Sequence, residues 1–143
     1  MGKIQAVCTS ETKGVHKRNR KTAHFIEGFG IEGDAHGGVH HRQVSLLSAD
    51  KINDFRVKGA EVIDGDFGEN LIVEGIDFKE LPIGTRFVCN DVILELSQIG
   101  KECHTRCNIY YSMGDCIMPR EGVFATVIRG GTISVGDELK VVD

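Results

Sequence analysis

Short strand-like segments, separated by glycine-rich turns, recur along the whole of this 143-residue chain. Each segment is rich in aliphatic or aromatic residues and is bounded by turn-forming residues, which is the pattern of a strand. The chain contains 18 glycines, mainly between these segments, and the pairs Gly130-Gly131 and Gly136-Asp137 indicate turns that need a positive φ. Many short strands with regular turns favour a closed or nearly closed β-barrel. The predicted strands are 3–8, 44–47, 70–73, 85–89, 92–97, 123–128 and 138–142.

One helix is predicted between the second and third of these strands. Ser48 is a suitable N-cap, and Ala49, Ile52 and Phe55 have the spacing of a buried stripe through about Val57. We expect this helix to plug or flank the barrel. The segment 100–122 has no clear period and is long for a connection, which is typical of a functional lid. The sequence therefore predicts a mostly β protein with a few short helices, forming a single domain over residues 1–143.

Composition narrows the class of protein. Hydrophobic residues make up 41% and charged residues 27% of the chain, and no apolar run is long enough to span a membrane. A net charge of −4 argues against nucleic-acid binding. The first residues lack the pattern of a signal peptide, and the five cysteines lack the spacing of a disulfide framework. We therefore expect a cytoplasmic protein with free thiols, in which Cys8 and Cys89 belong to the core.

Cys103 is the first candidate for chemistry. It follows the predicted strand 92–97, where a strand passes into a loop, and it has Lys101, His104 and Arg106 close by in the sequence. Nearby cations lower the pKa of a thiol and so favour the reactive thiolate. Cys103 is therefore predicted to be a nucleophile or a metal-contacting thiol. The alternative is a small buried residue without chemistry.

A histidine- and glycine-rich stretch at 33–43 is the second candidate. His36 and Arg42 lie in it beside Asp34, and Gly37-Gly38 allows backbone amides to approach a ligand closely. This mixture suits a phosphate, an oxyanion or a metal, although the spacing of a zinc protease motif is missing. The alternative is a solvated polar loop.

Further polar residues extend this prediction. A basic run at 13–21 follows the first strand, and Arg18 or Arg20 would suit a phosphate because a guanidinium donates two parallel hydrogen bonds. Such runs are otherwise solvated surface. Glu69 and Asn70 lie at the entrance to a strand, where Asn70 would hydrogen-bond a heterocyclic ligand or fix a turn.

Two other interpretations of the cysteines remain open. Cys103, His104, Cys107 and Cys116 include good zinc ligands, but their spacing lacks paired knuckles. If the loop turned helically, Cys103 and Cys107 would lie on one face at i and i+4 and would form a reversible disulfide. A resolving thiol at Cys107 or Cys116 is a further option.

Taken in order, these motifs resemble the MOSC domain, which is named for the C-terminal part of molybdenum cofactor sulfurases. The resemblance implies a MOSC-type β-barrel, similar to the barrel domain of pyruvate kinase, with a cleft for the molybdenum cofactor, a molybdopterin. The stretches that carry the resemblance are 33–37, 42–44, 67–71, the junction before Cys103, 122–128, Gly130-Gly131 and Gly136-Asp137.

The resemblance also implies roles for individual residues. Cys103 takes the position of the family cysteine, which bears a persulfide in sulfurases and contacts molybdenum in related reductases. The groups expected to hold the anionic cofactor are His36, Arg42, Lys101 and Asn70, with Arg18 and Arg20 as outer candidates.

The implied function is molybdenum-cofactor binding with sulfur carriage or sulfur transfer. The chain has no pyridoxal-phosphate domain, so we expect sulfur from a donor protein of the cysteine desulfurase type, or a molybdoenzyme as client. The alternatives are a noncatalytic molybdopterin carrier and a zinc-stabilised β protein.

Overall fold

The computed structural model describes residues 2–10, 18–35, 37–40, 42–57, 59, 69–99 and 122–142, without the side chains of Arg18, Phe55 and Lys79. The strands are β1 (Gly2–Thr9), β2 (Arg18–Asn19), β3 (Thr22–Ile26), β4 (Gly30–Ile31), β5 (Val44–Ser48), β6 (Leu71–Glu74), β7 (Arg86–Cys89), β8 (Val92–Ile99), β9 (Val123–Arg129), β10 (Gly131–Ser134) and β11 (Glu138–Val142). The helices are α1 (Ala49–Val57) and the short 3₁₀ helix η1 (Phe78–Glu80).

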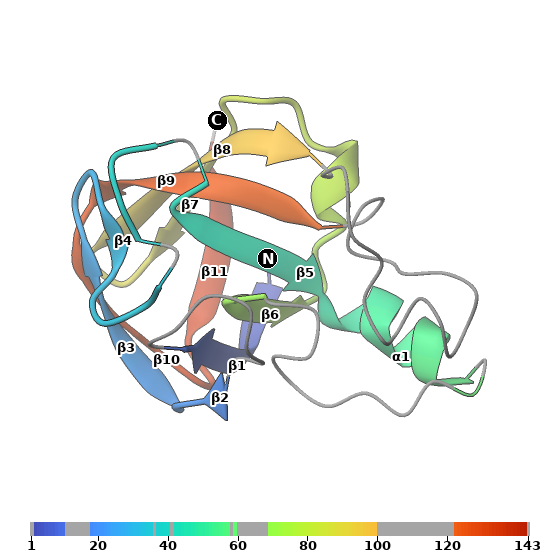
Figure 1. Ribbon diagram of the computed structural model, residues 1–143. Helices are drawn as coiled ribbons and strands as arrows, with labels where there is room; N and C mark the ends of the chain where they lie inside the picture. The colour runs from blue at the N-terminus through green and yellow to red at the C-terminus, as the bar shows by residue number, and fades with distance from the viewer. Residues whose placement is uncertain are drawn as a thin grey trace.

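Seven strands close into a β-barrel in the order β1, β11, β7, β8, β9, β5 and β6 (Figure 1). Pairing of β1 with β11 closes the barrel, and neighbours are antiparallel except for the parallel pair β5 and β6. Closure leaves no free sheet edge among these seven strands. The prediction of a mostly β barrel with few helices is confirmed.

The core follows from the two-residue period of the strands. In β8, Val92, Leu94 and Leu96 are buried and alternate with partly exposed residues. Because successive side chains point to opposite faces, this alternation directs one set into the barrel. At one point of the core, the rings of Phe78 and Phe87 meet edge to face with centroids 5.5 Å apart.

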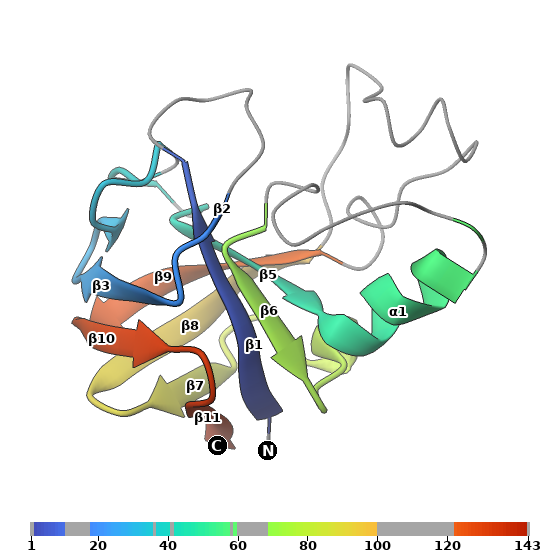
Figure 2. The same cartoon turned by 90° about the horizontal axis from the view of Figure 1, so that it is seen from below.

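Helix α1 lies outside the barrel beside β5 and β6 (Figure 2). A parallel strand pair needs a long crossover, and α1 belongs to that connection. Ala49 and Ile52 are buried, as predicted, and the predicted end at Val57 is confirmed. Capping by Ser48 stays a prediction, and the side chain of Phe55 lies outside the described part.

A second sheet, in the order β10, β3 and β4, lies on the side of the barrel away from α1 (Figures 1 and 2). Phe25, Ile31 and Ile133 anchor it to the core. The chain passes from β9 into β10 at Gly130, where a Cβ atom would lie 2.5 Å from the Phe25 carbonyl oxygen. Only glycine allows the two sheets to approach so closely at this point.

All seven predicted strands are found, whereas β2, β3, β4 and β10 are not predicted by the sequence pattern. Strand β3 buries only Phe25 among its side chains and β10 only Ile133, so neither has a clear alternation. Gly136 has a φ of 94°, which confirms the predicted positive-φ turn. Within the described ranges, no helix combines the length and hydrophobicity needed to cross a membrane.

Candidate functional site

Five residues at the ends of adjacent barrel strands form one lateral row, which we call the strand-end row. Register pairs Ser45 with Phe124 and Phe124 with Gln98, and hydrogen bonds join Asn70 to Ser45 and to Cys8. Neighbouring strands lie about 4.8 Å apart, so the row follows the curved wall of the barrel for about 19 Å. Its members are Cys8 on β1, Asn70 immediately before β6, Ser45 on β5, Phe124 on β9 and Gln98 on β8.

Asn70 is the centre of the hydrogen bonding in this row. Its Oδ1 accepts from the Ser45 amide at 2.9 Å and from the Ser45 hydroxyl at 3.1 Å. Its Nδ2 donates to the Cys8 carbonyl oxygen at 2.9 Å and to Asp34 Oδ2 at 3.2 Å. Asn70 is 1% exposed. These four bonds match the capacity of a side-chain amide, so Asn70 holds three segments together.

Asp34 attaches the glycine-rich stretch to the same place. Its second carboxylate oxygen, Oδ1, accepts from the Ser10 amide at 3.1 Å, and the Ala35 amide donates to the Ser10 carbonyl oxygen at 2.7 Å. Asp34 is buried. Since a buried carboxylate is tolerated only with hydrogen-bond donors, Asp34 defines how the stretch that begins at Gly33 meets β1.

Arg42 lies at the other end of the row. Its Nε donates to Gln98 Oε1 at 3.0 Å, and its guanidinium carbon lies 5.4 Å from the centroid of the Phe124 ring. The side chain is exposed. Within the part of the chain that the structure describes, its two Nη groups donate to no other group. Gln98 on β8 and Phe124 on β9 therefore orient the guanidinium, and its Nη groups are of the kind that bind anions.

Gln43, the residue after Arg42, holds the backbone next to Arg42 in place. Gln43 is buried, and its Oε1 accepts from the Val127 amide at 2.9 Å. The Gln43 carbonyl oxygen lies against Gly30, where a Cβ atom would come within 2.7 Å of it. This close approach fixes the direction in which the chain enters β5.

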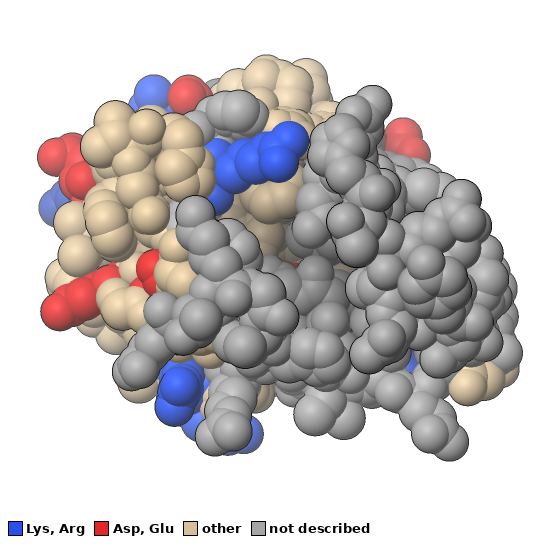
Figure 3. Space-filling view, in the orientation of Figure 1, with Lys and Arg blue, Asp and Glu red and all other residues tan. Residues whose placement is uncertain are grey.

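The predicted outer candidates lie near the opposite end of the row. Arg18 pairs with Thr9 in the backbone, and the Arg20 amide donates to the Val7 carbonyl oxygen at 2.7 Å. The Arg20 side chain is exposed. In the view of Figure 3, the Lys and Arg side chains are scattered over the described surface and do not gather into one patch.

Several predicted residues lie outside the described ranges: His36, Lys101, Cys103, Cys107 and Cys116. The roles assigned to them stay predictions. Among the residues that the structure describes, no group of three or more His, Cys, Asp or Glu side chains forms a metal site.

Sequence reasoning did not single out Gln98, Phe124 or Ser45. Gln98 belongs to a strand with alternating burial, and Phe124 has the pattern of an ordinary core residue. The contacts with Arg42 come from strands far apart in the chain, so no local signal identifies them. The sequence did place Asn70 at a strand entrance, but its side-chain bonds go to Ser45, Asp34 and Cys8, far away in the sequence, and not to residues of a turn.

The two cysteines in the described strands are buried, as predicted, since Cys8 is 0% and Cys89 1% exposed. Burial raises the pKa of the Cys89 thiol from 9.0 to about 11, and the Asp137 carboxylate is a smaller cause. A thiol with a raised pKa is a poor nucleophile at neutral pH.

The raised pKa of Cys89 predicts a loss of stability in alkali. Below pH 9 the Cys89 thiol is protonated in both the folded and the unfolded state. Above pH 9 the unfolded state loses the proton first, because its pKa is the lower one. The free energy of unfolding therefore falls from pH 9 through about 11. The expected contribution is on the order of 2 kcal/mol. Urea denaturation at pH 8 to 11 should show that the free energy of unfolding falls more steeply with pH for the wild type than for Cys89→Val. Equal slopes of the two pH dependences would contradict the prediction.

Comparison with known proteins agrees with this architecture. A model of the MOSC domain matches residues 32–140, and the chain therefore belongs to the MOSC family. Proteins of this family are generally linked to molybdenum-cofactor sulfurase-like function. A comparison with curated proteins yields no match.

Solved structures have the same fold. The YuaD protein from Bacillus subtilis superimposes with a TM-score of 0.78 at 21% identity, covering 99% of this chain and 96% of that one. YiiM from Geobacillus stearothermophilus has a TM-score of 0.73 at 15% identity, covering 100% of this chain and 76% of that one. YiiM from Escherichia coli has a TM-score of 0.67 at 17% identity, covering 99% of this chain and 70% of that one. At these identities the likeness establishes the fold alone.

Proposed function

We propose that this protein binds the molybdenum cofactor and carries or transfers sulfur, with Cys103 as the persulfide-bearing or metal-contacting thiol. Membership of the MOSC family supports the class of cofactor. The observation that carries the proposal is the position of Arg42 on Gln98 and Phe124. Gln98 belongs to β8 and Phe124 to β9, and Cys103 lies between these two strands in the sequence.

The donor chemistry of Arg42 fits the anionic part of the cofactor. Among the described residues none accepts a hydrogen bond from its Nη groups, and a guanidinium matches phosphate geometry with two parallel hydrogen bonds. Gln98 and Phe124 orient this group before a ligand arrives, which lowers the entropy lost on binding. His36 and Lys101 are proposed as further contacts, and Arg18 and Arg20 as outer ones.

Asn70 has a different part in the proposal. Its side-chain bonds go to Ser45, Cys8 and Asp34, so it supports the site and does not need to contact the cofactor. Through Asp34 it also holds the stretch that contains His36 in the sequence. We therefore assign Asn70 and Asp34 a positioning role.

The sulfur step is a thiol exchange. The Cys103 thiolate attacks the terminal sulfur of a donor persulfide, a new S–S bond forms on Cys103, and the donor leaves as a thiolate. Lys101, His104 and Arg106, close by in the sequence, favour the thiolate. When bound, the cofactor would supply a metal centre that takes sulfur ligands, and Cys103 with the cationic groups His36, Arg42 and Lys101 would hold it.

Replacement of Arg42 tests the cofactor site. We expect Arg42→Gln to weaken molybdopterin binding by about 10- to 100-fold, because a hydrogen-bonded charge is lost, and Arg42→Lys to weaken it less. Binding is measured by fluorescence titration of the pterin under anaerobic conditions. The matched control is Arg86→Gln, which removes an exposed arginine paired with Glu95 on β8. Equal affinities of Arg42→Gln and the control would contradict the proposal.

A further inference from the structure

Arg42 is held through its backbone as well as through its side chain. Its backbone amide donates to Nδ1 of His40 at 3.0 Å. Because Nδ1 accepts this bond, the neutral imidazole of His40 has its proton on Nε2. The position of His40 therefore affects the point from which the Arg42 side chain extends toward Gln98 and Phe124.

The backbone of His40 is bonded in turn to the residues before it. Its amide donates to the Gly38 carbonyl oxygen at 3.0 Å, which closes a three-residue turn with Val39 at its centre. The Gly38 amide donates to the Phe29 carbonyl oxygen at 2.8 Å. Three hydrogen bonds thus connect Phe29 to Arg42 through Gly38 and His40. We call this chain of bonds the Arg42 brace.

Phe29 attaches the brace to the barrel. It lies in the loop between β3 and β4, and the amide of the preceding Gly28 donates to the Val127 carbonyl oxygen on β9 at 2.9 Å. Figure 1 shows this loop and the chain that leads into β5 on the same side of the barrel. Phe124, which contacts the Arg42 guanidinium, also belongs to β9. The backbone and the side chain of Arg42 are therefore both fixed relative to one strand.

The Phe29 ring also lies directly against Gly37. A Cβ atom on Gly37 would lie 2.4 Å from Cε2 and 2.7 Å from Cζ of this ring. Gly37 has no positive φ, so the ring contact and not the backbone conformation requires glycine here. A larger residue at position 37 would therefore push the ring and the glycine-rich stretch apart.

We propose that Phe29, Gly37 and His40 are positioning residues for Arg42. This inference rests on the function proposed above, in which Arg42 binds the phosphate of the cofactor. The three residues act without touching the ligand, because they fix the backbone from which the arginine side chain extends. A side chain that is held in place before binding loses less conformational entropy when the ligand arrives.

Substitutions at His40 test the last bond of the brace. We expect His40→Ala to weaken molybdopterin binding about 5- to 10-fold, which is the size of the entropy cost of ordering one long side chain. His40→Asn should restore most of the affinity, because an asparagine side-chain oxygen accepts a hydrogen bond from the backbone amide two residues further on.

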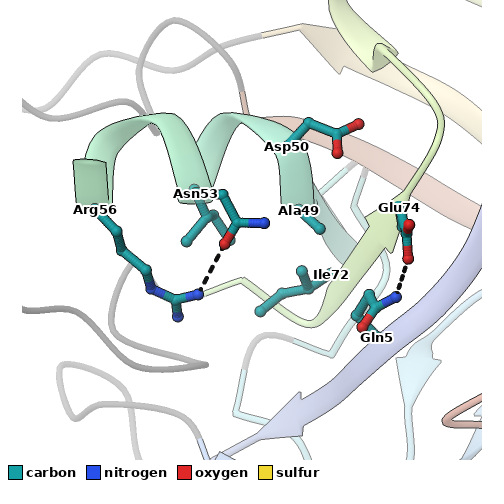
Figure 4. Close-up of a pocket in the computed structure, with 8 residues that line it drawn as sticks. Gln5, Ala49, Asp50, Asn53, Arg56, Ile72 and Glu74 are labelled. Carbon is teal, nitrogen blue, oxygen red and sulfur yellow. Dashed lines mark hydrogen bonds between the residues drawn. The ribbon is translucent and has the colours of Figure 1, made fainter. Parts of the chain in front are cut away.

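The matched control for His40→Ala is Asn53→Ala. Asn53 is also exposed, and its Oδ1 accepts a hydrogen bond from Arg56 at 3.2 Å on helix α1 (Figure 4). Helix α1 follows the end of β5, whereas Arg42 precedes its start. This control should leave the affinity for molybdopterin unchanged.

A double-mutant cycle tests the contact between Phe29 and Gly37. We expect Gly37→Ala to weaken molybdopterin binding about 5- to 10-fold in the wild-type background. In a Phe29→Ala background the same substitution should cause no further loss, since the added Cβ atom then meets no ring. Losses that add independently would overturn the coupling of these two residues to Arg42.

A measurement without cofactor separates this inference from the proposed function. The Nε–H signal of Arg42 in the ¹⁵N-labelled full chain reports its bond to Gln98, and its loss in Arg42→Gln assigns it. We expect the signal to move in His40→Ala and Gly37→Ala and to return in His40→Asn. These shifts without molybdopterin binding by the wild type would contradict the proposed function alone. An unmoved signal, or equal affinities of His40→Asn and His40→Ala, would overturn the inference.

Discussion

Replacement of Asn70 by alanine is expected to lower the free energy of unfolding by about 3–5 kcal/mol, a large loss for a single polar residue. The substitution removes all four side-chain bonds of a residue that is 1% exposed. It leaves the Cys8 carbonyl oxygen and one oxygen of the buried Asp34 carboxylate without the donor they have here, and buried groups that lose a partner carry a desolvation cost.

Urea denaturation at neutral pH measures this effect. The control is Asn53→Ala, an exposed asparagine on α1 whose loss should change stability by less than about 0.5 kcal/mol. Ser45→Ala removes one hydroxyl of the same network, and we expect an intermediate value of about 1–2 kcal/mol. If Asn70→Ala were as mild as Asn53→Ala, Asn70 would not join the strands as we describe.

Replacement of Cys103 by alanine is expected to abolish persulfide formation and leave the fold unchanged. The protein is incubated with a cysteine desulfurase and L-cysteine, and peptides are examined by mass spectrometry for the addition of one sulfur atom. In the wild type the added sulfur should lie on the peptide that contains Cys103. Circular dichroism and urea denaturation check that the variant folds as the wild type does.

Cys107→Ala and Cys116→Ala are the matched controls for this experiment. If either control failed to take up sulfur as completely as Cys103→Ala, the assignment of Cys103 as the acceptor would be wrong. Full sulfur transfer by Cys103→Ala would also contradict it.

If molybdopterin affinity survived loss of Cys103 but collapsed in Arg42→Gln, the protein would be a cofactor carrier. Stoichiometric zinc that depends on Cys107 and Cys116 would support the zinc-stabilised alternative.

Much of the barrel was predictable because each of its strands has a local signal. β8 alternates buried and partly exposed residues, and turns such as that at Gly136 need glycine for a positive φ. The second sheet, formed by β10, β3 and β4, was not predictable in the same way. β3 and β10 each bury one side chain, so their pairing depends on contact with the barrel at Phe25 and Ile133.

The candidate site divides along a similar line. Arg42 attracts attention in the sequence because it lies in the histidine- and glycine-rich stretch 33–43, and Asn70 because it is a polar residue at the entrance of a predicted strand. Their partners do not, because Gln98 and Phe124 become neighbours of Arg42 only when β8, β9 and β5 pair.

By itself, the sequence determined the strands of the barrel, the helix after β5, the buried cysteines and the resemblance to the MOSC family. These features depend on the order of residues within a short window or within a motif, where side-chain alternation and glycine conformation act locally. The tertiary structure alone decided that Asn70 joins three segments and that Arg42 lies on Gln98 and Phe124. Hydrogen bonds and ring contacts of this kind depend on strand register, which barrel closure sets across the whole chain.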